Sequence, residues 1–327
     1  MYIKFTVILI MLILNNLINF AQNSYFSNFS TNLVHINPAF VSSITSPEAS
    51  VTYRNQWPGL KDAFVTYGAS FSVPLIKYQS GVGFYFLNDK QGGGVITSTT
   101  INAIYAYNIK INPQIYLNAG LMASYYFKNL NAENLVFESD IRNSPGINGG
   151  QDIFESVRSS FWDFSLGFMA EIYSILDIGF SVQHIAQPKN YFSSSSNNML
   201  FRNYSLHASC DIPLIRSYGN NSPVFTPSLL FQKNKQHHQL IYGTRITVSS
   251  LSFGLWAKNN FKFNFSSLTA LAGFIQPNYK LFYNYDINLT RSNFLSYKMG
   301  AHEVTLLLML QHNEKRKKNR AIKCPKL

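Results

Sequence analysis

Charged residues are scarce in this sequence, since Asp, Glu, Lys and Arg make up only 13% of its 327 residues. An average soluble domain carries about twice that share. Long hydrophobic runs are also missing, because after the N-terminus no stretch reaches the roughly 18 apolar residues that a membrane-spanning helix needs. With a mean hydropathy of -0.03, this excludes a bundle of membrane helices. Low charge with 15% aromatic residues is typical of a transmembrane β-barrel, which has one lipid face and one wet face.

Cysteine is nearly absent, because Cys210 and Cys324 are the only two in the chain. Two cysteines exclude a disulfide scaffold and any multi-cysteine metal site. In an oxidising envelope they are the one candidate disulfide pair, and their large separation in sequence gives no geometric evidence for the bond.

Catalytic motifs are missing as well. The chain has no GxSxG elbow, no HExxH helix and no glycine-rich phosphate loop followed by a βαβ pattern. The adjacent His237 and His238 have no acidic or cysteine ligand nearby in sequence, so we interpret them as an exposed polar turn, with a metal site as the alternative. The sequence therefore predicts a non-enzymatic protein without cofactor or metal, and an envelope enzyme is the remaining alternative.

The N-terminus has the pattern of a secretory signal peptide. Lys4 precedes an apolar run from Phe5 to Leu14, and the small residue Ala21 precedes Gln22. We expect residues 1–21 to be a signal peptide that is cleaved after Ala21. An uncleaved membrane anchor is the alternative, although the run is short for a span.

Most of the chain alternates between apolar and small or polar residues with a period of two. From Trp162 to Ile172, for example, every second residue is apolar, and the residues between them include Asp163, Ser165 and Gly167. This period places the two sets on opposite faces of a strand. A soluble sandwich would more often carry Lys and Glu on its exposed face, so the small polar face predicts a barrel lumen.

Roughly fourteen such segments occur, each about ten residues long. They lie near residues 49, 64, 80, 95, 114, 162, 175, 201, 224, 238, 251, 267, 279 and 303. An even number of strands is typical of a bacterial transmembrane barrel, whose two termini lie on the same side. We therefore predict an all-β antiparallel transmembrane barrel over residues 46–312, an N-terminal periplasmic or plug segment over residues 22–45, and a basic periplasmic tail over residues 313–327.

The lengths of the connections alternate along the chain. Short connections fall at 73–80, 108–114, 173–177, 248–250 and 276–280. Long connections fall at 87–95, 128–161, 187–200 and 288–302. Outer-membrane barrels have short periplasmic turns and longer outer loops, so both termini are predicted to be periplasmic. The connection at 212–223 is longer than expected for its side.

The net charge of +12 is concentrated at the C-terminus. From Glu314 onward, seven lysines and arginines accompany one glutamate, which accounts for half of the net charge. An exported chain meets no genome, so nucleic acid is not an expected partner. The tail is predicted to meet an anionic surface or an acidic partner, or else to be a solvated end that keeps the terminus out of the membrane.

Several ionisable residues fall on the small, polar face of predicted strands, among them four that could form a site: Glu171, Asp177, Arg245 and Asp286. Charges that line a barrel interior usually satisfy one another and stiffen the wall. We interpret these four as structural, and a transport or catalytic site is the alternative.

Several motifs together resemble one family. They are INPAF at Ile36 to Phe40, TYRNQWPGL at Thr52 to Leu60, FSVPL at Phe71 to Leu75, GVGFYFLNDKQGG from Gly81, YAY at Tyr105 to Tyr107, SLGFMAE from Ser165, AHEVTLLL from Ala301, and CP at Cys324 and Pro325. These residues resemble the PorP/SprF family of type IX secretion system membrane proteins from about residue 30 to the C-terminus. The chain departs from the pattern at His35, and at Leu327 where an aromatic residue is expected.

The resemblance implies an outer-membrane β-barrel in a Bacteroidetes-type envelope, multi-pass and in contact with outer-membrane lipid. It also implies a role in type IX secretion and, in some members, in gliding motility. The implied partners are large secreted cargo adhesins, which such barrels help to export or retain at the cell surface, and a periplasmic peptidoglycan-binding protein. The residues alone leave another hypothesis open: a channel or hydrophobic-solute transporter, with Asn23 to Phe40 as a plug.

The most specific motif residues are the candidate signature and structural positions: Asn37, Pro38, Tyr53, Arg54, Asn55, Gln56, Trp57 and Pro58. The alternation predicts that Arg54 and Gln56 point into the lumen, while Tyr53 and Trp57 lie near the membrane interface. We expect Arg54 to tie down the N-terminal segment and close the barrel, and direct binding of a partner is the alternative.

Overall fold

The computed structural model describes residues 26–60, 63–131, 157–189, 199–214, 222–235, 238–260, 264–289 and 300–310. The predicted signal peptide and the basic tail lie outside the described residues, and so do His237 and Cys324. Cys210 is described and lies at the end of a strand, partly exposed. The proposed disulfide and the cleavage site therefore stay predictions.

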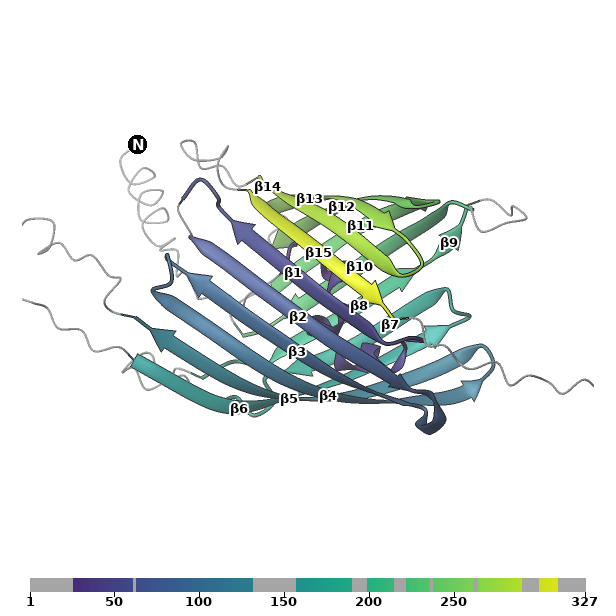
Figure 1. Ribbon diagram of the computed structural model, residues 1–327, viewed down its shortest axis with the longest axis horizontal. Coiled ribbons are helices and arrows are strands. Elements are labelled where there is room, and N and C mark those ends of the chain that lie inside the picture. The colour runs from purple at the N-terminus through teal and green to yellow at the C-terminus, as the bar shows by residue number, and fades with distance from the viewer. Residues whose placement is uncertain are drawn as a thin grey trace, which may run out of the picture.

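The chain forms a closed antiparallel barrel of 14 strands (Figure 1). The strands are β1 (Glu48–Gln56), β2 (Phe64–Leu75), β3 (Ser80–Gln91), β4 (Ile96–Asn112), β5 (Ile115–Leu130), β6 (Val157–Ile172), β7 (Leu176–Gln183), β8 (Asn203–Cys210), β9 (Ile212–Pro213), β10 (Val224–Lys233), β11 (His238–Val248), β12 (Leu251–Asn260), β13 (Asn264–Ile275), β14 (Tyr279–Asn288) and β15 (Ala301–Met309). β8 and β9 both pair with β10 and are separated only by Asp211, so they form one wall strand. The predicted fold and strand number are confirmed.

The barrel closes where the first strand meets the last. β1 pairs with β15 over its whole length, from Glu48 opposite Met309 to Gln56 opposite Ala301. We call this β1–β15 junction the seam. Closure satisfies the backbone groups of both terminal strands, which a sheet in a membrane cannot leave open to lipid.

The two faces of each strand differ as the alternation predicts. On β6, the side chains of Trp162, Phe164 and Phe168 are 61%, 52% and 56% exposed on the outside of the barrel. Asp163 and Ser165, between them, are buried on the inside. The outer face therefore suits lipid, and the inner face suits polar contacts in the lumen.

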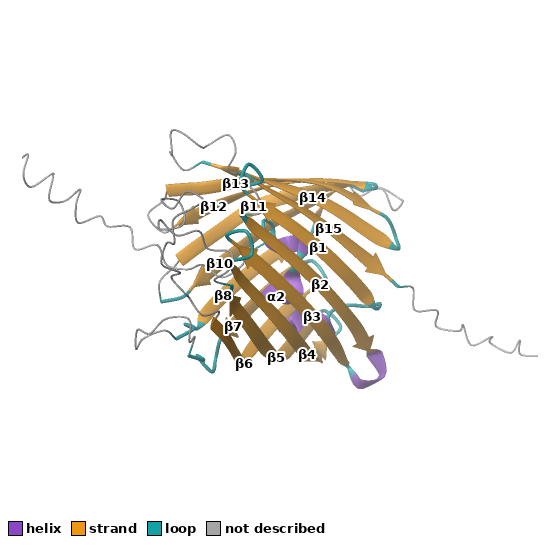
Figure 2. Ribbon diagram, turned by 60° about the vertical axis from the view of Figure 1, so that its left-hand side comes forward, coloured by secondary structure: helices purple, strands orange, loops and turns teal. Residues whose placement is uncertain are grey.

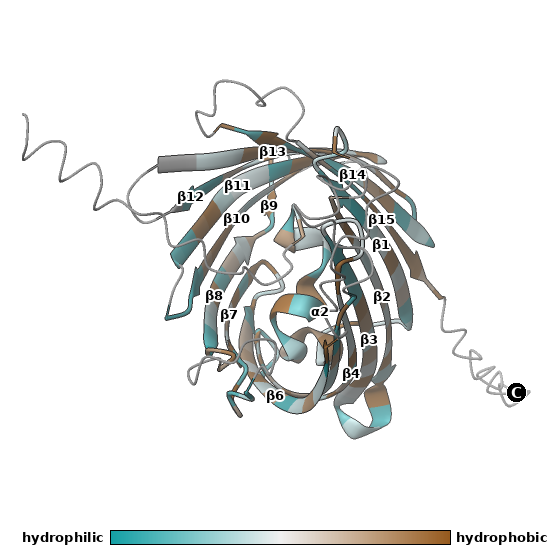
Figure 3. Cartoon of the chain, turned by 90° about the vertical axis from the view of Figure 1, so that its left-hand side faces the viewer, coloured by the Kyte–Doolittle hydropathy of each residue, from teal (hydrophilic) through white to brown (hydrophobic). Residues whose placement is uncertain are grey.

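Residues 26–42, here called the lumen segment, lie inside the barrel (Figures 2 and 3). They form three short helices: η1 (Phe29–Thr31), α2 (Leu33–Ile36) and η2 (Pro38–Ser42). Asparagines cap two of them, because Asn28 accepts from the Ser30 N–H and Asn37 accepts from the Ala39 N–H, each at 2.9 Å. One further short helix, η3 (Ile76–Tyr78), connects β2 to β3. Among the described residues, no helix is both long and apolar enough to cross a membrane.

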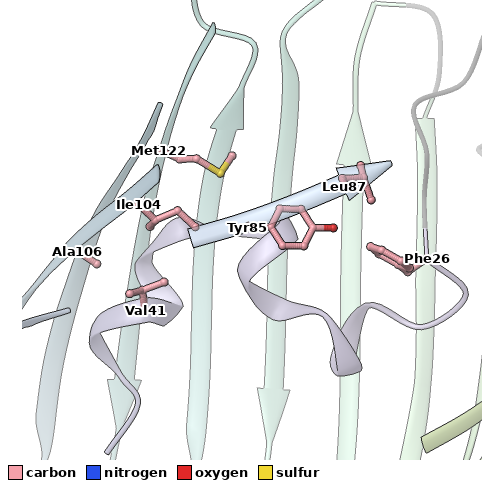
Figure 4. Close-up of a cluster of buried hydrophobic side chains, with 7 residues drawn as sticks. All are labelled: Phe26, Val41, Tyr85, Leu87, Ile104, Ala106 and Met122. Atoms are coloured by element: carbon pink, nitrogen blue, oxygen red, sulfur yellow. The ribbon is translucent and has the colours of Figure 1, made fainter. Parts of the chain in front are cut away.

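The hydrophobic core lies between the lumen segment and the wall. Figure 4 shows one cluster, in which Phe26 and Val41 meet side chains of β3, β4 and β5: Tyr85, Leu87, Ile104, Ala106 and Met122. A second cluster places Phe29 and Ile36 against β10 to β14, through Leu230, Ile241, Trp256, Leu271 and Phe282. Burying each large apolar side chain contributes about 1.5–3 kcal/mol, so these contacts hold the lumen segment on two sides.

The connections differ in length at the two ends of the barrel. β4 and β5 are separated by two residues, and β11 and β12 also by two. At the other end, β7 ends at Gln183 and β8 begins only at Asn203. This asymmetry agrees with the predicted pattern, and the assignment of the short-turn end to the periplasm stays a prediction.

Candidate functional site

The lumen segment is anchored to the wall by two groups of polar side chains. The first, the seam cluster, contains Ser27, Arg54, Lys258, Thr269, Asn284, Asp286 and Glu303. The second, the Asn37 niche, contains Asn37, Gly167, Gly179, Ser181 and His207. The first group binds the start of the lumen segment and the second binds it ten residues later, just before η2, so together they fix its path across the lumen.

Four opposite charges meet in the seam cluster. Nη1 of Arg54 lies 3.0 Å from Oδ2 of Asp286 and 3.6 Å from Oε2 of Glu303. Lys258 approaches the same Asp286 oxygen at 3.3 Å. All four side chains are less than one tenth exposed, and two cations balance two carboxylates. A buried charge group of this kind is tolerable only when each member is paired and hydrogen-bonded.

Strand pairing brings these residues together. Arg54 on β1 lies directly opposite Glu303 on β15, and Glu303 lies opposite Asn284 on β14. Thr269 on β13 lies opposite Asp286. The cluster therefore spans neighbouring strands on both sides of the seam, and its register depends on barrel closure.

Ser27 is the contribution of the lumen segment to this cluster. Its backbone N–H donates to Oε2 of Glu303 at 2.5 Å, and its hydroxyl donates to Asp286 at 3.0 Å. Arg54 donates to the same hydroxyl oxygen. Thr269 and Asn284 complete the shell of the two carboxylates, at 2.5 Å and 3.2 Å. The cluster therefore links the N-terminal segment to the strands that close the barrel.

The Asn37 niche binds the lumen segment at the start of η2. The Asn37 side-chain amide donates to the backbone oxygens of Phe168 at 3.0 Å and Phe180 at 3.4 Å, and lies 3.0 Å from Nε2 of His207. Beside it, the Ser181 hydroxyl donates to the backbone oxygen of Ile36 at 2.7 Å. One asparagine thus caps η2 with its side-chain oxygen and binds backbone oxygens of β6 and β7 with its side-chain nitrogen, so it uses both the acceptor and the donor of its amide.

Glycines on the wall strands make room for this contact, because they have no side chain. A Cβ atom on Gly167 would lie 1.9 Å from Oδ1 of Asn37. A Cβ atom on Gly120, on β5, would lie 2.5 Å from the backbone nitrogen of Ala39. These glycines allow the backbone of the lumen segment to approach the wall more closely than any other residue would.

The structure places half of the motif residues in the lumen. Asn37 and Pro38 begin η2 and are buried. Arg54 is 7% exposed, and its Nη2 donates to the Gln56 side-chain oxygen at 3.0 Å. These four residues therefore line or occupy the interior, two from the lumen segment and two from β1.

The other four motif residues lie on the outward face of β1 or at its C-terminal end. Tyr53 is 40% exposed on the outer face, with its ring 5.4 Å from that of Tyr67. Asn55 is partly buried on the same face. Trp57 has a positive φ of 61° and donates its N–H to Gly300, and Pro58 lies in the exposed turn that follows. These residues lie apart from the seam cluster and shape the end of the strand.

Of the four ionisable residues that the alternation singled out, only Asp286 joins the seam cluster. Glu171 and Asp177 lie directly opposite each other on β6 and β7, so the interpretation of opposite charges in pairs does not describe them. Arg245 is on β11, away from the cluster, and its Nε has no hydrogen-bond partner among the described residues.

Sequence reasoning singled out only Arg54 and Asp286 of the seam cluster and missed its five other members: Ser27, Thr269, Asn284, Lys258 and Glu303. The alternation contains a signal for the last two, since they fall on the inner parity of β12 and β15. Ser27 lies outside any strand, so no periodic signal marks it. Within the described residues, no group of three or more His, Cys, Asp or Glu side chains could hold a metal ion.

Solved structures with some similarity include several outer-membrane proteins. KdgM porin is 9% identical, with a TM-score of 0.39, over 81% of this chain and 99% of that chain. Omp33 of Acinetobacter baumannii is 10% identical, with a TM-score of 0.43, over 81% and 98%. A FadL homologue of Pseudomonas aeruginosa is 12% identical, with a TM-score of 0.41, over 84% and 93%. These similarities are too low to carry an argument about function.

A comparison with curated proteins finds no match. The comparison with protein families finds one described as "Type IX secretion system membrane protein PorP/SprF", which matches residues 18–308 and therefore nearly the whole chain. The match includes both ends of the lumen segment and every strand except the last residue of β15. The chain therefore belongs to the PorP/SprF family of type IX secretion system membrane proteins, as an outer-membrane β-barrel.

Proposed function

We propose that this barrel is a non-enzymatic accessory protein that assists the secretion or the cell-surface anchoring of large type IX cargo proteins, such as gliding adhesins. The family supports the general role in type IX secretion. The observation that supports the accessory role is the anchored lumen segment. It lies in the interior of the barrel, where a transporter would need an open path for its solute.

The contacts of the lumen segment favour a rigid support. Ser27 and Asn37 are both fully buried and bound to the wall, and apolar side chains between them, such as Phe29 and Ile36, pack against it. Releasing the lumen segment would break its contacts with the seam cluster, with the Asn37 niche and with two apolar clusters at the same time. A barrel held in this way presents a fixed set of outer loops and periplasmic turns, which suits binding between proteins.

Deleting the gene is expected to remove at least one large exported adhesin from the cell surface. Surface labelling of intact cells, followed by mass spectrometry of the released proteins, measures the effect. Expression of the wild-type chain from a plasmid should restore the adhesin and serves as the control. Normal attachment of every large adhesin in the deletion strain would overturn the proposal.

The purified protein is expected to be electrically silent in planar lipid bilayers, because the lumen segment lies across the interior and is bound to the wall. The competing hypothesis, a channel or hydrophobic-solute transporter, predicts instead a steady conductance or saturable solute uptake. An open-porin control measured in the same bilayers shows that insertion is detectable. Steady conductance from the wild-type chain would favour the channel.

The periplasmic side of the proposal involves two further partners. We propose that a peptidoglycan-binding protein meets the short-turn end of the barrel and that the basic tail contributes to this contact through charge. Adhesin export and cell-wall attachment would then act on opposite ends of one rigid barrel.

A further inference from the structure

Strand β6 is paired unequally on its two sides. On one side it pairs with β5 along its whole length, from Val157 to Ile172. On the other side it pairs with β7 only from Leu166 to Ile172. Among the described residues, no strand pairs with residues 157–163 on the β7 side. We call this stretch the free edge of β6.

The direction of the backbone groups along the free edge follows from two hydrogen bonds. Tyr173, just beyond β6, donates its N–H across to Gln114 beside β5 at 2.6 Å. The backbone oxygen of Phe164 accepts from Ile185, on the β7 side, at 3.0 Å. Because backbone groups of successive residues point to opposite sides of a strand, even-numbered residues of β6 face away from β5. Arg158, Ser160 and Trp162 therefore present N–H and C=O groups at the free edge.

The free edge lies at the end of β6 where the outward side chains change from apolar to polar. Below it, Phe164 and Phe168 are exposed apolar side chains of the lipid face. Trp162 packs on Tyr125, with ring centroids 4.7 Å apart, as in the aromatic girdle at a membrane interface. Beyond Trp162, the outward residues are Ser160 and Arg158, which are polar. The exposed apolar side chains thus end at Trp162, and the outward residues beyond it on the free edge are polar.

An unpaired strand edge in water is a template for another strand. Its alternate N–H and C=O groups can each bond to an added chain, and adjacent side chains then set the specificity. Natural proteins commonly protect such an edge with prolines, bulges or very short length. The free edge of β6 contains no proline, and β5 pairs with it in regular register up to Val157.

We propose that the free edge of β6 receives an extended segment of an exported partner protein, which adds to the barrel wall as one more strand. The inference rests on the proposed function and names the surface at which the exported chain binds. The stretch accommodates about seven residues.

The charges and apolar groups at the edge define the partner segment further. Arg158 is exposed on the outer face, whereas the one acidic residue of the free edge, Asp163, is buried on the lumen face, with its Oδ2 2.7 Å from Nδ1 of His184. An acidic side chain next to Arg158 is therefore favoured across strands. Trp162, which is 61% exposed, favours an apolar side chain at the membrane end of the added strand. The partner is thus an extended peptide that is acidic at one end and apolar at the other.

Photo-crosslinking in native membranes tests the proposal on the full-length chain. A photo-reactive amino acid is placed in turn at positions 158, 160 and 162, and crosslinked peptides are identified by mass spectrometry. We expect crosslinks to one segment of an exported protein. When the probe moves by two residues along β6, the crosslinked position should move by two residues along that segment. Crosslinks only to residues 132–156 or 190–198 of the same chain, or only to a second copy of it, would overturn the proposal.

A proline substitution separates backbone pairing from side-chain contact. Ser160→Pro removes an N–H that faces away from β5, so the barrel should still form, which resistance of the folded band to detergent in gels verifies. With the probe at position 162, capture of the partner should fall about tenfold in Ser160→Pro. Ser160→Ala keeps the N–H and should retain capture. Equal capture in the two variants would contradict strand addition.

The two proposals fail in distinguishable ways. The deletion strain could lose adhesins while the Ser160→Pro variant displays adhesins and captures the partner normally. That result would overturn the free-edge proposal alone. Normal adhesins in the deletion strain would overturn the accessory function, while an alternating crosslink pattern would still support strand addition.

Discussion

Replacing Arg54 by methionine is expected to lower the free energy of unfolding of the barrel by about 3–5 kcal/mol, because it leaves buried carboxylates without their shared cation. Lys258 still reaches Asp286 at 3.3 Å, whereas no other salt bridge among the described residues reaches Glu303. Glu303 is fully buried, so its charge would be compensated only by its hydrogen bonds from Ser27 and Asn284 and by the more distant charge of Lys258. Urea unfolding in lipid vesicles, followed by tryptophan fluorescence and by gel mobility, measures the loss.

Arg202→Met is the matched control for this substitution. Arg202 is exposed, and its one described hydrogen bond, to the backbone oxygen of Ile185, is 3.3 Å long. Its replacement should change stability by no more than about 0.5 kcal/mol. Adding Glu303→Gln to Arg54→Met removes the uncompensated charge and should recover part of the loss. If Arg54→Met is no worse than the control, the seam cluster does not stabilise the barrel.

Gly167→Ala is expected to displace the lumen segment from the wall. The added Cβ would lie 1.9 Å from Oδ1 of Asn37, so the asparagine must leave the niche and lose its bonds to two strands. Overpacking of this kind costs about 1–3 kcal/mol, which raises the released population about tenfold or more. The labelling rate of a cysteine at Val41→Cys, a fully buried position, measures the release in a variant without the native cysteines.

Ser165→Ala is the control for the glycine substitution. Ser165 lies on the same strand and the same lumen face, is buried, and its replacement adds no atoms. It should leave the labelling rate nearly unchanged. In the double variant Asn37→Ala, Gly167→Ala the clashing side chain is gone, so the combined effect should be smaller than the sum of the two single effects. Slow labelling of Gly167→Ala, equal to that of the parent, would show that the close contact does not hold the segment.

Much of the barrel is predictable from the sequence. The alternation of Trp162, Phe164 and Phe168 with Asp163 and Ser165 correctly assigns the two faces of β6, and comparable patterns locate every wall strand. This succeeds because the direction of a side chain on a strand depends only on its position along that strand. The inward direction of Arg54 follows from the same local rule.

The seam cluster could be predicted only in part. Arg54 and Asp286 were assigned to the lumen face, yet nothing in their neighbourhoods indicates that they meet or that Glu303 and Lys258 join them. Arg54 and Asp286 are separated by 232 positions, and their contact depends on the register of β1 with β15. Register across the seam is the outcome of all the intervening strand pairs, so no local pattern contains it.

By itself, the sequence determined the fold class, the strand positions, the side-chain faces and the family, because each of these depends on residues close together in the chain or on a recognisable motif. Only the tertiary structure decided where the lumen segment lies, which charges are paired and which part of β6 has no partner strand among the described residues. The bond from Ser27 to Glu303 joins residues 276 positions apart. Such a contact forms only when barrel closure brings the two ends of the chain together and the bonds formed there outweigh the entropy lost in closing the loop between them.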